Sequence, residues 1–157
     1  MGSVSFSVNG TFYSWNEQDS QNASNANTFL LMNIYSAAPG TYIFYVSNAA
    51  SNWLIPGKEI NLTFNTNTLT TNTPFTLTNT TAPSYPYPHE IVIYPSTVYD
   101  AAYVYFASSI GDFATVTITN IHDGRADGSF SAKLTRVSDA STINITNGIF
   151  KNVEILP

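Results

Sequence analysis

The residues with the clearest potential for chemistry are a histidine beside a carboxylate and a pair of nearby aspartates. His89 directly precedes Glu90, and a carboxylate next to an imidazole can orient the ring or help it to bind a metal ion. Asp123 and Asp127 lie in the stretch DGRADG, where carboxylate and carbonyl oxygens could surround Ca²⁺. Each has a structural alternative: a solvent-facing histidine at the start of a strand, and aspartates that form turns.

The structural alternative is the expected one for DGRADG. Arg125 sits between the two aspartates, and the stretch has fewer acidic residues than a calcium-binding loop needs. A chain of 157 residues can also bury a core without help from a metal ion. We therefore expect no metal requirement and no cofactor, with Asp123 and Asp127 as the only calcium candidates.

Three aromatic residues stand outside any strand-like alternation. Trp53 lies between turn-forming residues, and Tyr85 and Tyr87 lie in a proline-rich stretch that ends at His89. Prolines reduce the entropy lost when such side chains are held in one place. Exposed rings can stack on the apolar faces of sugars. The candidate ligand-binding residues are therefore these three aromatic residues together with His89. The alternative is that the rings fold back as a lid on the core.

Motifs of enzymatic catalysis are missing from the sequence. It contains no Gly-x-Ser-x-Gly, no His-Glu-x-x-His, no phosphate-binding loop and no cysteine. Its ten acidic residues are scattered, mostly near turns, although two could meet in space as a glycosidase requires. We therefore expect a protein that is not an enzyme, with a hydrolase as the last of the alternatives.

Composition excludes several classes of partner. Charged residues are 10% of the chain and the net charge is -5, so the chain cannot neutralise many phosphates and nucleic-acid binding is not expected. Anionic membrane surfaces are disfavoured for the same reason. No apolar run reaches the roughly 18 residues of a transmembrane helix. Asparagine, threonine and serine must supply most of the polar surface.

The elements that position these residues are predicted to be strands. Apolar residues alternate with polar ones at a period of two, and no window has the spacing of an amphipathic helix. The alternating residues are Val4, Phe6 and Val8; Leu30, Met32 and Ile34; Ile60, Leu62 and Phe64; Phe75 and Leu77; Val116 and Ile118; Phe130, Ala132 and Leu134; Ile143 and Ile145; Val153 and Ile155. Three richer runs, at 41–46, 90–94 and 101–107, are expected to be strands buried on both faces.

Turn dipeptides separate these runs. Asn9-Gly10 and Asn147-Gly148 are predicted to form hairpin turns, and Asp123-Gly124 and Asp127-Gly128 to mark further turns. The pattern predicts one all-β domain over 1–157, an antiparallel sandwich or barrel of about ten short strands with little or no helix.

Two polar stretches interrupt the pattern. The segment 16–27 has no strand character, and the segment 65–89 is rich in Thr, Asn, Pro and Tyr. Long segments of this kind often carry function. Residues 1–3 are expected to be an expression start and not native sequence.

Three short motifs lie near the ends of the chain: an opening strand that ends at Asn9-Gly10, a late strand with Gly128-Ser129-Phe130, and a closing hairpin from Thr146 to Phe150. In these motifs the chain resembles a family of small exported lipoproteins of Bacteroidota. The resemblance covers about 11 residues at the start and about 40 at the end. It implies an all-β domain of unknown activity, and a location at the cell surface, in the periplasm or outside the cell. It also implies a lipid anchor in the precursor, although the lipid-bearing cysteine is not in this sequence.

These observations favour a non-catalytic binding or accessory module of an exported protein. The expected ligand is carbohydrate or another neutral polar polymer, which suits a weakly charged surface rich in Asn and Tyr. The alternative is a structural protein of the cell envelope that pairs strands with a protein partner. A binding role predicts aromatic residues that line a cleft, whereas a structural role predicts an exposed strand edge.

Overall fold

Eleven strands form one curled sheet in the computed structural model, which describes residues 2–16, 31–47, 58–66, 68–78, 89–93, 104–106, 109–136 and 139–157. The strands are β1 (Ser3–Val8), β2 (Thr11–Asn16), β3 (Leu31–Ala38), β4 (Thr41–Ser47), β5 (Lys58–Asn65), β6 (Pro74–Thr78), β7 (His89–Ile93), β8 (Val104–Phe106), β9 (Phe113–His122), β10 (Arg125–Thr135) and β11 (Thr142–Leu156). These residues include no helix, which confirms the predicted all-β class.

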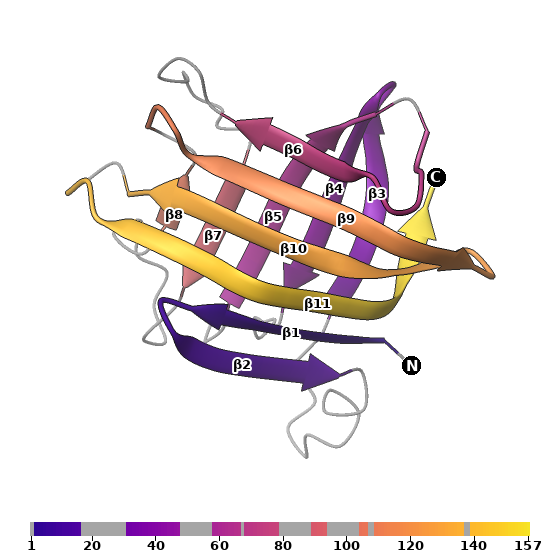
Figure 1. The fold of residues 1–157 in the computed structure, drawn as a ribbon, viewed down its shortest axis with the longest axis horizontal. Helices are drawn as coiled ribbons and strands as arrows, with labels where there is room; N and C mark the ends of the chain where they lie inside the picture. Colours follow the sequence, from indigo (N-terminus) through magenta and orange to yellow (C-terminus); the bar gives the residue numbers. More distant parts are fainter. Residues whose placement is uncertain are drawn as a thin grey trace.

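The sheet curls into a half-barrel whose two sides form layers. Its strand order is β2-β1-β11-β3-β4-β5-β7-β8-β10-β9-β6, with a further pairing of β11 with β10. In Figure 1, β6, β9, β10, β11, β1 and β2 form a front layer that crosses over β3, β4, β5, β7 and β8 behind it. The long segment 65–89 is thus partly regular, since it contributes β6 to the front layer and the first residue of β7 to the rear layer.

The strand β11 joins the two layers. It pairs antiparallel with β10 on one side and with β1 on the other. Its last residues then leave the front layer and pair with β3 from Glu154 to Leu156. This last pairing is parallel, whereas the other described pairings are antiparallel as predicted. The reason is that β11 bends across to the rear layer before it ends.

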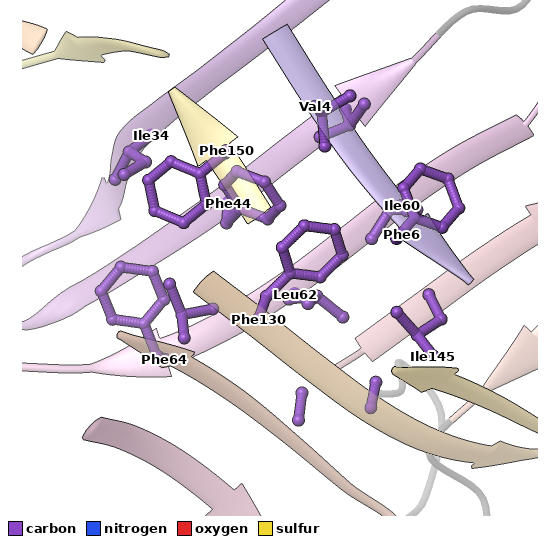
Figure 2. Packing of buried hydrophobic residues seen from close by; sticks show 14 of the residues in the cluster. Val4, Phe6, Ile34, Phe44, Ile60, Leu62, Phe64, Phe130, Ile145 and Phe150 are labelled. Carbon is purple, nitrogen blue, oxygen red and sulfur yellow. The ribbon is translucent and has the colours of Figure 1, made fainter. Parts of the chain in front are cut away.

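The core lies between the layers and is built from the alternating residues. Val4, Phe6 and Val8 are all buried, as are Ile143 and Ile145, which confirms the alternation as a core signal. Figure 2 shows phenylalanine rings from both layers in contact at the centre. The centroid of the Phe44 ring in the rear layer lies 4.9 Å from the ring centroid of Phe130 and 4.8 Å from that of Phe150. Both of these partners are in the front layer.

Two predicted hairpin turns are confirmed. Asn9 and Gly10 join β1 to β2 with φ of 47° and 86°, and Asp123 and Gly124 join β9 to β10 with φ of 48° and 72°. Positive φ at both central residues is what a type I′ turn requires, and Asn, Asp and Gly tolerate it best. The first hairpin also brings Trp15 against the core, with its ring 5.0 Å from that of Phe6.

The predicted hairpin at Asn147-Gly148 was wrong. Both residues lie inside β11, which runs without a break from Thr142 to Leu156. Asn147 does take a positive φ of 54°, but as part of a β-bulge. On β11 two residues separate Ile145 from Gly148. Their partners on β10, Ala132 and Phe130, are separated by only one residue. Asn at positive φ serves a bulge as well as a turn, so the dipeptide alone does not distinguish them.

The predicted turn at Asp127-Gly128 was also wrong, because both residues lie inside β10. Gly128 faces Phe150 on β11, and a Cβ built on it would lie 2.4 Å from that ring. Gly148 faces Phe130 in the same way, and its Cβ would lie 2.4 Å from the Phe130 carbonyl oxygen. Glycine is therefore needed here for close packing across the β10–β11 pair, and not for a reversal of the chain.

Candidate functional site

The outer face of the front layer is covered by small hydroxyl side chains. Buried and half-buried residues alternate along all of β1, the first six residues of β9 and all but the last residue of β10. In these stretches the buried residues enter the core and the residues between them point outward. We call the half-buried outward group the outer hydroxyl face: it consists of Ser5, Ser7, Thr115, Thr117, Ser129 and Ser131. Sequence reasoning treated these residues only as the solvent side of each strand.

Strand register brings these hydroxyl residues into rows across the sheet. Thr117 pairs with Ser129, which in turn pairs with Ile149 on β11. In the neighbouring row Thr115 pairs with Ser131, and the Thr115 hydroxyl lies 2.8 Å from that of Thr76 on β6. The rows join residues that are far apart in sequence, so they could not be seen before the register was known.

A shallow hollow of about 290 Å³ opens on this face. Its lining consists of Thr115, Thr117, Ser129, Phe130, Ser131, Asn147 and Gly148. Phe130 and Gly148 are the buried members of the lining, while the others offer hydroxyl groups and one amide. Gly148 lacks a side chain, and the bulge at Asn147 turns an amide to the outer face in its place.

The hollow carries no formal charge. None of its lining residues is ionisable. Along β10 the nearest charged residues are Asp127, two residues before Ser129, and Lys133, two residues after Ser131. On β11 the nearest is Lys151, which pairs with Ser3 on β1. The hollow is therefore suited to a neutral ligand that exchanges hydrogen bonds with hydroxyl and amide groups.

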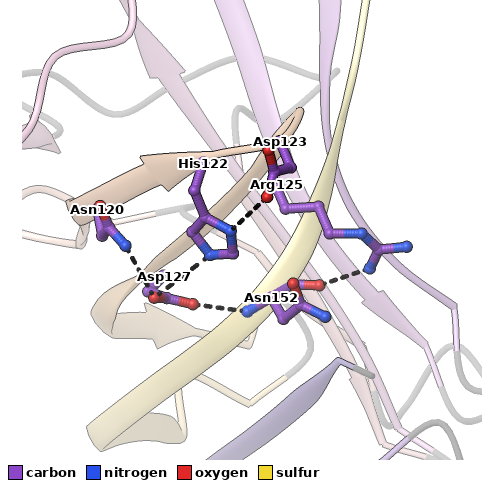
Figure 3. A network of polar contacts seen from close by, with 6 residues as sticks. All are labelled: Asn120, His122, Asp123, Arg125, Asp127 and Asn152. Atoms are coloured by element: carbon purple, nitrogen blue, oxygen red, sulfur yellow. Dashed lines mark hydrogen bonds and ion pairs between the residues drawn. The ribbon is translucent and has the colours of Figure 1, made fainter.

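A second polar cluster lies where β11 bends toward the rear layer. In Figure 3, the side chains of Asp127 and Arg125 on β10 form hydrogen bonds with the backbone N–H and carbonyl groups of Asn152. The Asn152 N–H donates to Asp127 Oδ1 at 2.7 Å, and its carbonyl oxygen accepts from Arg125 at 2.8 Å. Asn152 has a φ of 56°, which marks another bulge. The hydrogen bond from Asn152, helped by Asn120 and His122, holds the pKa of Asp127 below its usual value.

This cluster contains the predicted calcium candidates, and its geometry gives them no support as a metal site. His122 lies between the carboxylates, with Nδ1 4.0 Å from Asp123 and Nε2 3.6 Å from Asp127. Both oxygens of Asp127 already have partners, while the Asp123 side chain is 98% exposed. Across the described parts of the chain, no group of three or more His, Cys, Asp or Glu residues is arranged to hold a metal ion.

The buried carboxylate of Asp112 is also structural. It accepts hydrogen bonds from the backbone N–H groups of Ser109 and Thr135, at 2.9 and 3.1 Å, and from the Thr135 hydroxyl at 2.9 Å. These bonds tie the turn before β9 to the end of β10. With its oxygens occupied in this way, Asp112 is not placed to act on a substrate in the hollow.

The described structure does not test the four ligand-binding residues predicted from the sequence. Trp53, Tyr85 and Tyr87 lie outside the described residues. The backbone of His89 opens β7 in the rear layer and pairs with Leu62, but its side chain lies outside the description. The predicted ligand-binding role of these residues stays a prediction.

Comparison with known families, characterised proteins and solved structures gives no match to this chain, so the candidate site is argued from its own geometry. Within the described residues there is no helix long and apolar enough to cross a membrane.

Proposed function

We propose that this protein is a non-catalytic binding module of an exported or cell-surface protein, and that the hollow on its outer hydroxyl face binds neutral carbohydrate. The observation that supports the proposal is the uncharged hollow lined by Thr115, Thr117, Ser129, Ser131 and Asn147. The location rests on the resemblance of the chain ends to exported lipoproteins.

The chemistry of the lining matches that of a sugar. A hydroxyl group both donates and accepts, so neighbouring serines and threonines can pair with sugar hydroxyls of either polarity. Ile149 lies beside Ser129 in the register and is 48% exposed, which offers an apolar contact next to the polar ones. A sugar ring likewise presents hydroxyl groups at its edge and C–H groups on its face.

A binding experiment with matched variants tests this proposal. Wild-type protein is screened on an array of neutral oligosaccharides, and the strongest binder is then titrated by calorimetry. Replacing both Thr117 and Ser129 by alanine removes hydroxyl groups worth about 0.5–1.5 kcal/mol each, so affinity should fall about tenfold. Thr142→Ala is the control, because Thr142 is exposed on β11 but outside the hollow lining.

Two results would overturn the proposal. One is an array with no neutral oligosaccharide bound by folded wild-type protein. The other is an equal loss of affinity in the double variant and in Thr142→Ala, which would place the contact elsewhere. Trp53→Ala and Tyr85→Ala belong in the same titration, since those rings remain predicted contacts.

A further inference from the structure

Two large apolar side chains are exposed on the same face as the hollow. Phe12 on β2 is 65% exposed and Ile149 on β11 is 48% exposed. The neighbour of Phe12, Tyr13, stacks on the buried ring of Phe6 at 5.7 Å, so the alternation of β2 turns Phe12 to the outer side. Single exposed apolar residues are common on protein surfaces and carry no argument alone. What matters here is how these two are aligned with the hollow.

The two residues lie in neighbouring rows, so the line that joins them to the hollow crosses the strands obliquely. Ile149 pairs with Ser129 at the edge of the hollow and with Ser5 on β1. Phe12 pairs with Ser7, which pairs with Thr146 of the same bulge that contributes Asn147 to the hollow. From β9 to β2 this line crosses four strand spacings of about 4.8 Å, or roughly 19 Å.

The surface along this line is low and uncharged. Between the hollow and Phe12 the outward side chains are Ser5, Ser7, Thr146 and Ile149, which leave no tall side chain to block a ligand lying on the sheet. Each strand crossed offers at least one hydroxyl group. A single sugar ring would fill the hollow and leave Ile149 and Phe12 uncovered, whereas a chain of linked rings would reach both.

We infer that the ligand is an extended neutral oligosaccharide, lying across the strands from the hollow to Phe12, with Ile149 and Phe12 against the apolar faces of successive rings. The inference rests on the function proposed above and adds the length and direction of the ligand. Charge supports this occupant, because the line from Thr115 to Phe12 carries hydroxyl, amide and apolar groups and no ionisable side chain.

The test measures affinity as a function of ligand length. Gluco-, xylo- and manno-oligosaccharides from the monosaccharide to the hexasaccharide are titrated into wild-type protein. Affinity should rise with length until the ligand reaches Phe12 and then level off. Phe12→Ser should lower the affinity for the hexasaccharide about tenfold, as expected for the loss of a stacked ring, and leave the affinity for the disaccharide unchanged. The control is Ile110→Ser, since Ile110 is 69% exposed in the turn before β9 and off this line.

The outcomes separate this inference from the function on which it rests. If monosaccharide and hexasaccharide bind equally, or if Phe12→Ser changes neither affinity, the inference is wrong and the hollow remains a sugar site. If no member of any series binds, the proposed function fails as well. Sedimentation that shows a dimer of wild-type protein, dissociated by Phe12→Ser, would mean that this face pairs two copies and would also overturn the inference.

Discussion

At the scale of single residues, the β10–β11 pair depends on two glycines that make room for phenylalanine rings. Gly128 faces Phe150 and Gly148 faces Phe130, and in each pair the missing side chain lets the partner ring lie over the glycine backbone. The rings then reach the rear layer at Phe44. Glycine weakens an isolated strand, so its presence at these positions reflects packing.

Gly148→Ala should destabilise the protein. A glycine whose backbone suits alanine gains about 0.4–1 kcal/mol from this change, because the unfolded chain becomes less flexible. Here the new Cβ would lie 2.4 Å from the Phe130 carbonyl oxygen and 2.8 Å from its ring. Overpacking of this kind costs about 1–3 kcal/mol, so urea unfolding should show a lower free energy of unfolding. An unchanged or increased free energy would contradict the close packing described for this pair.

At the scale of elements, β11 changes its phase twice, and the changes determine where the hollow and the bend lie. Ile143 and Ile145 point inward at odd positions, Gly148 and Phe150 at even positions, and Val153 again at an odd position. Each change coincides with an asparagine at positive φ, Asn147 for the first and Asn152 for the second. The bulges open the outer face at Asn147 and turn the strand toward β3 after Asn152.

The sequence predicted the strands that keep one phase and missed the element that does not. In β1, the residues Val4, Phe6 and Val8 keep strict alternation, and their burial follows from it directly. In β11, a shift of phase beside Asn-Gly looks like the end of one strand and the start of the next. Only the partner strands show which it is, because a bulge keeps its pairing on both sides. The hollow was missed for a related reason, since its lining comes from separate strands joined only by register.

Asp127 should make the bend of β11 sensitive to acid. Its pKa is lowered from 3.8, mainly by the hydrogen bond from the Asn152 N–H. The folded state therefore favours the charged carboxylate, and the stabilisation is complete above the unfolded pKa of 3.8 and lost as pH falls through the lower folded value. Asp127→Asn should lower the melting temperature at pH 7, and the difference from wild type should shrink as pH falls from 3.8 through the lower folded pKa. A difference in melting temperature that stays the same at every pH would show that the charge on Asp127 does not stabilise the folded protein.

At the scale of the whole molecule, the two layers are joined at one side by a short parallel contact. Glu154, Ile155 and Leu156 of β11 pair with Asn33, Ile34 and Tyr35 of β3. The Ile155 N–H also donates to the Gly124 carbonyl oxygen at 2.8 Å, which ties this end of β11 to the β9–β10 hairpin. The closure of the half-barrel therefore depends on residues 154–156. The alternation of apolar and polar residues in the sequence identifies these residues only as the end of a strand.

Removal of residues 155–157 should loosen the contact between the layers. The parallel pairing would lose two of its three residue pairs, and the edge of β3 beside Ile34 would be opened to solvent. We expect a lower melting temperature together with increased binding of a hydrophobic dye, since the core between the layers becomes accessible. Replacing only Pro157 by alanine is the matched control. A truncated protein with the wild-type melting temperature and no added dye binding would show that the parallel end of β11 is not needed for closure.

The position of β11 in the chain has a consequence for the order in which the molecule can form. Its partners β1 and β3 are among the earliest strands in the sequence, while β11 is the last of the described strands. During synthesis, β1 and β3 must therefore wait for more than a hundred residues to be added before their neighbour exists. Pairings at such long sequence separation pay their loop-closure entropy late, and domains dominated by them fold in milliseconds to seconds. The half-barrel can close only after translation has passed β11, so a nascent chain that stops short of it should remain open and sensitive to protease.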